Sequence, residues 1–142
     1  MPEFLDLHGR TNKVLRALTE AGLQRHGLHL GQDHLLAALW ERDGRAPGEI
    51  AAAVNVSTPG VVKMAGRMIQ AGLVTRQPDD RDHRLVRLWL TDEGRALQEP
   101  IEAERQSIEN KVTENLAPAE REQLLRALAK VYDSANALSR PA

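Results

Sequence analysis

The sequence has 142 residues and contains no cysteine, and only 3% of its residues are aromatic. Without cysteine the chain cannot form a disulfide, supply a thiolate nucleophile or sense peroxide through a thiol. No apolar run approaches the roughly 18 residues of a membrane-spanning helix, and the first residues lack the profile of a signal peptide. These absences predict a cytoplasmic protein that makes no membrane contact. Alanine and leucine supply most of its hydrophobic residues, which suits a helical fold.

The motifs of common enzyme classes are lacking as well. The sequence has no glycine-rich phosphate loop, no nucleophile motif and no convergent pair of carboxylates. His8, His26, His29 and His34 are loosely spaced, and no cysteine or well-placed carboxylate completes a metal site with them. We therefore expect neither an enzyme nor a bound cofactor or metal ion.

A net charge of −1 is unfavourable for a protein that binds nucleic acid, because phosphate contacts need cations. The distribution of charge answers this objection. Between Ser57 and Leu90 there are six lysines and arginines against three aspartates, whereas the segments on both sides are mildly acidic. Ordinary solvated charges would give the same balance, so this excess alone does not establish a nucleic-acid partner.

The pattern from Pro47 to Gln70 is typical of a helix-turn-helix. Residues 48–54 predict a short helix with Ile50, Ala53 and Val54 facing inward, and with Ala51 small enough for a close helix crossing. A second helix follows, in which one apolar stripe repeats at intervals of three and four residues. That stripe consists of Val61, Met64, Ala65 and Met68.

The turn between these helices is short. Asn55 tolerates the left-handed conformation that ends a helix, and Val56 is expected to plug the corner. Ser57 or Thr58 can cap the next helix, with Pro59 in its first turn. The second helix of such a pair enters the major groove of DNA.

A β-hairpin is predicted directly after the second helix. Gly72 ends that helix, residues 73–77 and 84–90 read as strands, and the polar residues 78–83 form the turn between them. Val86, Leu88 and Leu90 share one face of the second strand, opposite Leu85, Arg87 and Trp89. A hairpin with arginines near its tip, placed after a recognition helix, is a wing.

Four further helices complete the predicted fold. They cover residues 5–24, residues 32 or 33 to 42, a long helix capped by Thr91 with a kink near Pro100, and residues 118–138. The first and last carry apolar stripes that need a partner, which favours a two-fold homodimer. The fold class is therefore mainly α with a small β-hairpin wing. We expect one domain over residues 1–142, with a winged helix-turn-helix body at 30–95 and helical dimerisation segments at 1–29 and 96–142.

With this order of elements, the chain resembles the MarR family of bacterial transcription regulators over nearly its whole length. The most specific matches are Val56-Ser57 leading to Val61, the run Gly72–Arg76, and the wing sequence Asp79–Arg84 that continues to Leu90-Thr91-x-x-Gly94. The resemblance implies a homodimer that binds a pseudo-palindromic operator, usually as a repressor, and is released by a small anionic or aromatic ligand. Thr58, Gly60 and Val62 stand where the family often has hydroxyl or basic residues, so base preference does not transfer. Ala117 replaces the usual capping residue before Pro118.

The residues expected to contact double-stranded DNA lie on the exposed face of the second helix and at the wing tip. They are Ser57, Thr58, Pro59, Gly60, Val62, Lys63, Arg67, Arg81 and Arg84. We expect Ser57 and Thr58 on phosphate, Lys63 and Arg67 on phosphate or guanine, and Val62 on a thymine methyl. Arg84 is the candidate for the minor groove, and Arg81 is expected to pair with the aspartates around it, although the two arginines could exchange roles.

An effector pocket is expected where the first two helices meet the long helix. Its candidate residues are His8, Asn12, His34 and Trp40, although ordinary helix packing would explain them equally well. The main alternative to a DNA-binding regulator is a winged helix that recruits another protein and does not bind DNA. The basic wing argues against that alternative.

Overall fold

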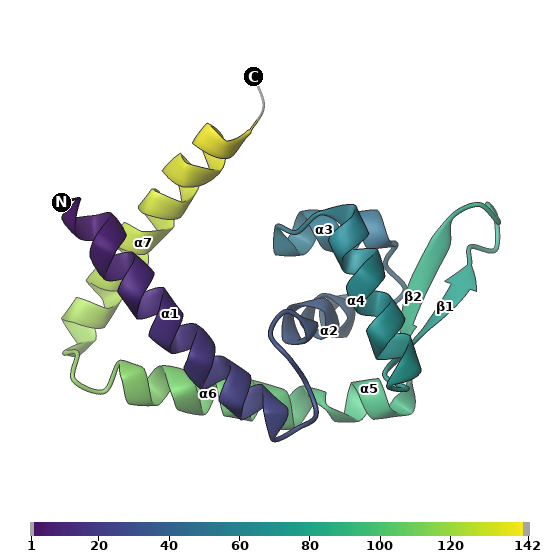
Figure 1. Ribbon diagram of the computed structural model, residues 1–142, viewed down its shortest axis with the longest axis horizontal. Helices are drawn as coiled ribbons and strands as arrows, with labels where there is room; N and C mark the ends of the chain where they lie inside the picture. Colours follow the sequence, from purple (N-terminus) through teal and green to yellow (C-terminus); the bar gives the residue numbers. More distant parts are fainter. Residues whose placement is uncertain (1, 141–142) are drawn as a thin grey trace. The chain divides into compact units, whose positions relative to one another are not determined.

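The computed structural model describes residues 2–140, which form seven α-helices and one β-hairpin (Figure 1). The helices are α1 (Glu3–Gln24), α2 (Gln32–Glu41), α3 (Pro47–Val54), α4 (Thr58–Gln70), α5 (Asp92–Ala96), α6 (Gln98–Val112) and α7 (Pro118–Ser139). The hairpin consists of β1 (Val74–Pro78) and β2 (Val86–Leu90), which pair antiparallel. The mainly helical fold with a two-stranded wing is confirmed.

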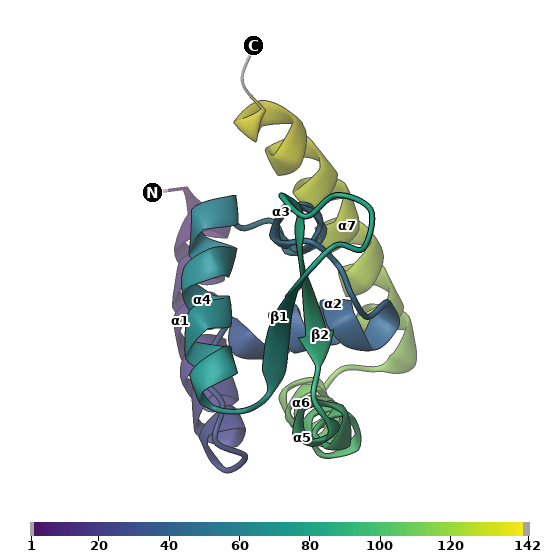
Figure 2. The ribbon, with the colours of Figure 1, turned by 90° about the vertical axis from the view of Figure 1, so that its right-hand side faces the viewer.

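The core lies where α2, α3, α4 and the hairpin meet. It is built from aliphatic side chains that are at most 1% exposed in the chain. They include Leu35, Leu36 and Leu39 of α2, Ile50 of α3, Val61 and Met68 of α4, Val74 and Leu88 of the hairpin, and Ile101 of α6. Figure 2 shows α4 and the hairpin side by side over α2. This core fixes the positions of the second helix of the turn and of the wing relative to each other.

The helix after the wing is interrupted earlier than expected. We predicted a kink near Glu99 and Pro100, whereas the break lies at Leu97, between α5 and α6. Pro100 cannot donate a hydrogen bond to the carbonyl of Ala96, and its ring crowds the preceding turn. The irregularity therefore falls in the turn before the proline.

The chain divides into two compact units that meet in sequence at Gln106 and Ser107, within α6. In the second unit Arg121 of α7 pairs with Glu109 at 2.7 Å. The Glu120 carboxylate accepts a hydrogen bond from the Ala117 N–H at 2.9 Å, which compensates in part for the missing cap side chain. Within residues 2–140, no helix has both the length and the apolar character needed to cross a membrane.

The apolar stripes of α1 and α7 are exposed in the single chain. On α1 they comprise Phe4, Leu5, Leu7, Val14 and Leu18, and on α7 Leu124, Leu125, Leu128, Val131, Tyr132 and Leu138. Neither helix places a large apolar side chain of its stripe in the core, apart from Leu23 near the end of α1. This amount of exposed apolar surface is unusual for a monomer.

Candidate nucleic-acid interface

The turn between α3 and α4 is built from two caps. Asn55 has φ 57° and ψ 44° and ends α3, and the Val56 N–H donates back to the Ala51 carbonyl at 3.1 Å. The Ser57 hydroxyl then caps α4 by accepting a hydrogen bond from the Gly60 N–H at 3.1 Å. The left-handed Asn55, the Ser57 cap and the short turn are confirmed.

Two side chains of this region face the opposite way from the prediction. Val56 was expected to plug the corner and is 44% exposed, and Ala53 was expected inward and is also exposed. The buried arc of α3 spans Ile50, Val54 and Ala51, about 100° of the helix, and Ala53 lies outside it. Val56 instead lies beside the start of α4, where its Cγ1 would be 3.2 Å from a Cβ at Gly60.

One side of α4 is buried as the sequence predicts. Val61, Ala65 and Met68 are at most 1% exposed, and Met64 is half-buried beside them. Gly72 follows the helix with φ 80°, and the Leu73 N–H donates to the Met68 carbonyl at 3.0 Å. This glycine-centred ending turns the chain directly into β1.

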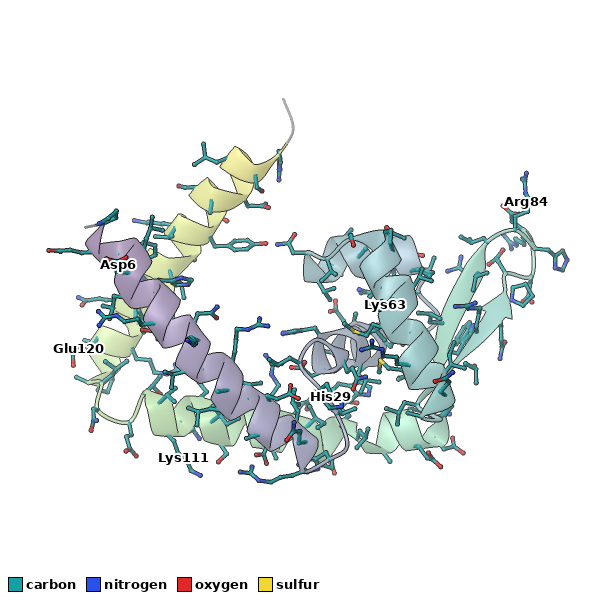
Figure 3. All side chains as sticks on the ribbon, in the orientation of Figure 1. Asp6, His29, Lys63, Arg84, Lys111 and Glu120 are labelled. Atoms are coloured by element: carbon teal, nitrogen blue, oxygen red, sulfur yellow. The ribbon has the colours of Figure 1, made fainter. Side chains whose placement is uncertain are left out.

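The opposite side of α4 faces solvent and carries the residues predicted to contact DNA. Thr58, Pro59, Val62, Lys63 and Arg67 are exposed. Within residues 2–140, the side chains of Lys63 and Arg67 form no ion pair or hydrogen bond, and Figure 3 shows Lys63 on this helix. Gly60 is half-buried beneath the Ser57 cap. Lys63 lies in the middle of α4 and Arg67 in its last turn, and two unpaired cations on one exposed side of a helix form a surface suited to phosphate.

The hairpin register places Val74 opposite Leu90 and Arg76 opposite Leu88. Val74, Leu88 and Leu90 are buried against the helices, whereas Leu85 and Trp89 on the other face are partly exposed, as predicted. The Arg84 side chain is 94% exposed at the turn, where Figure 3 shows it pointing away from the strands. The wing therefore presents its arginine tip to solvent beside α4.

The aspartates of the tip have different partners from those predicted. We expected Arg81 to pair with them, but within the described chain its side chain forms no ion pair, and only its backbone N–H donates to Asp79, at 3.0 Å. Arg84 instead contacts Asp82 at a long 3.4 Å, and Arg87 binds Asp79 at 2.6 Å. The reason is the turn geometry, in which Asp79 faces back toward β2 and Arg87.

Hydrogen bonds to Asp79 hold the base of the tip together. Its carboxylate accepts from Arg87 and from the backbone N–H groups of Asp82 and Arg81, and these bonds lower the pKa of Asp79 to about 2. The Asp79 carboxylate in turn raises the pKa of Arg87. The carboxylate is therefore ionised at any pH at which the protein works.

Arg87 also connects the wing to α3, a role that the sequence did not reveal. Its guanidinium donates to the Gly44 carbonyl at 3.0 Å and lies 3.5 Å from Glu49, which in turn pairs with Arg42 at 2.6 Å. Arg87 is half-buried, so it is not one of the cations free for an external partner. Its alternation with Leu85 and Trp89 predicted the face of the strand on which it lies, but not the groups that it binds.

A hollow of about 530 Å³ lies between the wing and the loop before α3. It is lined by Trp89 and by side chains of both charges, including Arg42, Arg45, Glu49, Asp79 and Arg87. Most of these charged groups already pair with one another across it. None of the four residues predicted to form an effector pocket lines this hollow.

The Leu-Thr-x-x-Gly segment joins the wing to α5 by close packing. Thr91 caps α5 by accepting from the Gly94 N–H at 3.1 Å, and its hydroxyl donates to the Gly72 carbonyl at 2.6 Å. A Cβ at position 94 would lie 2.2 Å from the Leu73 carbonyl oxygen, so only glycine fits there. The Trp40 indole N–H donates to the Gly94 carbonyl at 3.0 Å. The motif thus fixes the position of α5 against the end of the wing.

The predicted effector-pocket residues are dispersed over two helices. His8 and Asn12 are exposed on α1, where His8 stacks on Phe4, and His34 is exposed on α2 beside the buried Asp33. Within residues 2–140, no hydrogen bond or ion pair joins any two of the four candidates. The indole N–H of Trp40 is occupied by Gly94. The pocket remains a prediction.

Histidines and carboxylates do pair near the end of α1. His29 lies 2.8 Å from Glu20, and this contact, with the Leu30 N–H, lowers the pKa of Glu20. His26 lies 3.6 Å from Glu104 of α6, which also binds Arg25. In the part of the chain that the structure describes, no group of three or more such side chains could hold a metal ion. These contacts fasten the loop between α1 and α2.

A short helix pair, an exposed second helix and a basic hairpin beside it define a winged helix-turn-helix protein. The family model for the MarR family matches residues 26–85. The repressor MdtR of Bacillus subtilis is 29% identical over 131 residues, which cover 92% of this chain and 84% of MdtR. The chain is thus similar to the MarR family of transcriptional regulators, whose members are not enzymes.

Solved structures agree with this assignment. BpsR of Bordetella bronchiseptica, solved in a study of how 6-hydroxynicotinic acid regulates its DNA binding, is 25% identical, with a TM-score of 0.83 over 90% of this chain and 91% of that one. A mutant MarR of E. coli complexed with operator DNA is 24% identical, with a TM-score of 0.84 over 92% and 94% of the two chains. The latter likeness concerns the fold alone.

Proposed function

We propose that the protein is a homodimeric repressor that binds a pseudo-palindromic DNA operator and is released by a small aromatic or anionic effector. The observation that carries this proposal is the surface of α4. Lys63 and Arg67 are exposed and unpaired within residues 2–140, and the hairpin beside α4 holds Arg84 at 94% exposure. One element suits the major groove and the other the adjacent minor groove.

Each DNA contact is assigned a role. Lys63 and Arg67 bind phosphate or guanine, Thr58 and the Ser57 end of α4 bind phosphate, and Pro59, Gly60 and Val62 lie against the groove. Arg84 enters the minor groove, and Arg81, which makes no side-chain ion pair within the described chain, binds backbone phosphate. Residues 30–95 form the DNA-binding body in this proposal.

The exposed apolar stripes of α1 and α7 support the dimer. Residues 1–29 and 96–142 would supply the interface, and a two-fold axis would place two copies of α4 on successive turns of the duplex. The name of MdtR as a repressor supports the direction of regulation. The regulation of BpsR by 6-hydroxynicotinic acid supports an aromatic acid as effector, with His8, Asn12, His34 and Trp40 as the candidate pocket.

Selection of bound duplexes from a random pool tests the proposal. We expect an inverted repeat with half-sites about one helical turn apart. Lys63→Ala and Arg67→Ala should each weaken binding to it by roughly 1–3 kcal/mol if base edges are contacted, or lower the salt dependence by about one unit of slope if only phosphate is. Lys111→Ala, on α6, is the matched control and should bind normally.

The outcome of the selection also separates the alternative function. A winged helix that recruits only proteins would recover no sequence, and heparin would remove whatever duplex it retained. Affinity unchanged in both Lys63→Ala and Arg67→Ala would remove α4 from the DNA interface.

A further inference from the structure

Gly66 occupies a position where the chain itself does not require glycine. It lies in the interior of α4, and a Cβ built there would meet no other atom within 4 Å. Glycine is the least favourable residue in a helix interior apart from proline. The packing of the described chain therefore gives no reason for glycine at this position.

The other glycine of the same helix differs in this respect. A Cβ at Gly60 would approach the Ser57 hydroxyl oxygen to 3.0 Å and Val56 Cγ1 to 3.2 Å, so the cap of α4 accounts for that residue. Gly66 has no such internal reason. A partner that approaches α4 closely from outside would give glycine an advantage at this position.

Val62 lies one turn before Gly66 on the same side of α4, because residues four apart are neighbours on a helix surface. Its side chain is 42% exposed, a cost for a large apolar residue unless a partner covers it. Lys63 and Arg67 lie next to the pair, both on the same side of it, and neither has an ion-pair partner within residues 2–140. This side of α4 therefore has an apolar centre next to two free cations.

We propose, on the basis of the proposed function, that α4 recognises thymine through the 5-methyl group, with Val62 as the residue that contacts it. The thymine methyl is the apolar group that base edges present in the major groove. Gly66 lets the duplex approach the helix backbone closely, and Lys63 and Arg67 bind phosphates on one side of that contact. Apolar contact, and not bidentate hydrogen bonding, thus sets base preference in the middle of each half-site.

Replacement of thymine by deoxyuridine tests the contact, because it removes only the methyl group and leaves base pairing intact. Each thymine of the selected half-site is replaced in turn, and binding is measured by titration with wild type and with Val62→Ala. At one position per half-site, wild type should lose about fourfold in affinity, as expected for one buried methyl group. Val62→Ala should bind thymine and deoxyuridine nearly equally at that position.

Gly66→Ala provides an independent test, since it should affect stability and binding in opposite directions. Alanine favours the helix and meets no atom of the chain, so the melting temperature should rise by a few degrees while operator affinity falls at least tenfold. Gly48→Ala is the control. Gly48 is exposed in the first turn of α3, outside the residues assigned to DNA contact or to the dimer, and a Cβ there also meets nothing within 4 Å, so this variant should not weaken binding.

The outcomes separate this inference from the function on which it rests. A protein that selects no duplex loses the proposed function itself. Specific binding in which every deoxyuridine is tolerated, or in which wild type and Val62→Ala lose equally, overturns the thymine contact and leaves the regulator intact. Normal binding by Gly66→Ala overturns the close approach of the duplex to α4.

Discussion

The helix-turn-helix body buries its apolar residues, whereas the terminal helices leave theirs exposed. In α4, Val61 and Met68 are 1% and 0% exposed, whereas Leu7 of α1 and Leu128 of α7 are 61% and 44% exposed. Both regions have amphipathic stripes of similar aliphatic content. They differ in whether one chain can cover the stripe.

This difference indicates which parts of the molecule are complete. The body closes its core mainly from α2, α3, α4 and the hairpin, which lie within residues 32–90, with Leu23 of α1 and Ile101 of α6 added. The stripes of α1 and α7 leave apolar surface in water, at a cost that association with a second copy would remove. In the proposed dimer, the terminal helices would set the spacing between two bodies whose own cores are already closed.

The largest effect should come from charging the α7 stripe. The double substitution Leu124→Glu and Leu128→Glu places two carboxylates where the proposed dimer is apolar, and unpaired buried charges cost several kcal/mol. We expect monomers by light scattering and a loss of operator affinity of at least about 100-fold, because the second body no longer binds in the same complex. The control variant Lys130→Glu, which changes a residue of α7 outside the apolar stripe, should remain dimeric. An intact dimer of the double variant would contradict the assignment of this face.

Truncation in the body should act on folding instead. Met68→Ala leaves a cavity in a site with no exposed surface and should lower the free energy of unfolding by about 2–5 kcal/mol. Urea unfolding at a fixed protein concentration measures it. Leu7→Ala, on the exposed side of α1, should change the stability of the monomeric α7 double variant by less than about 0.5 kcal/mol. Equal losses at the two positions would remove the contrast between the regions.

The sequence predicted α4 well because its determinants are local. The Ser57 cap, the stripe from Val61 to Met68 and the ending at Gly72 each depend on residues at most a few positions apart. Helix periodicity and capping are the signals that survive in a single sequence. For the same reason the bounds of α1, α2 and α7 were close to those observed.

Contacts between distant residues were not predictable in this way. Arg87 binds Asp79 across the turn and Gly44 across the fold, and no spacing in the sequence identifies those partners. Arg81 was assigned to the aspartates because it is adjacent to them in sequence. Val56 was placed inward because it is apolar, whereas in the structure Ile50 and Ala51 are buried and Val56 is 44% exposed. In each case tertiary packing decided between options that were equal locally.

Within the body, the tip of the wing should affect binding without affecting stability. The Arg84 side chain is 94% exposed and, among residues 2–140, pairs with Asp82 alone, at 3.4 Å, so it contributes little to folding. Arg84→Ala should weaken operator binding by about 1 kcal/mol, most strongly where an A·T-rich flank narrows the minor groove, and leave the urea midpoint unchanged. Titrations on operators with A·T-rich and G·C-rich flanks measure the loss of affinity on each, and urea unfolding measures the midpoint. Affinity equal to wild type on both operators would exclude Arg84 from the interface.

The smallest effect concerns the base of the wing. Charge and hydrogen bonds stabilise this base, whereas apolar burial stabilises α4. The pKa of Asp79 is lowered to about 2, first by Arg87 and then by the N–H groups of Asp82 and Arg81. A lowered pKa means that the contribution of these bonds is complete above the ordinary pKa, near 4, and is lost as the pH falls through about 2. Carboxyl carbon shifts should give that midpoint, and the amides of Arg81 and Asp82 should exchange faster over the same range. Arg87→Ala should move the midpoint back up, because the guanidinium no longer stabilises the charged carboxylate, whereas Gln77→Ala, opposite Arg87 in the hairpin, should leave it in place. A midpoint that stayed near 2 without Arg87 would show that the turn backbone alone holds the wing.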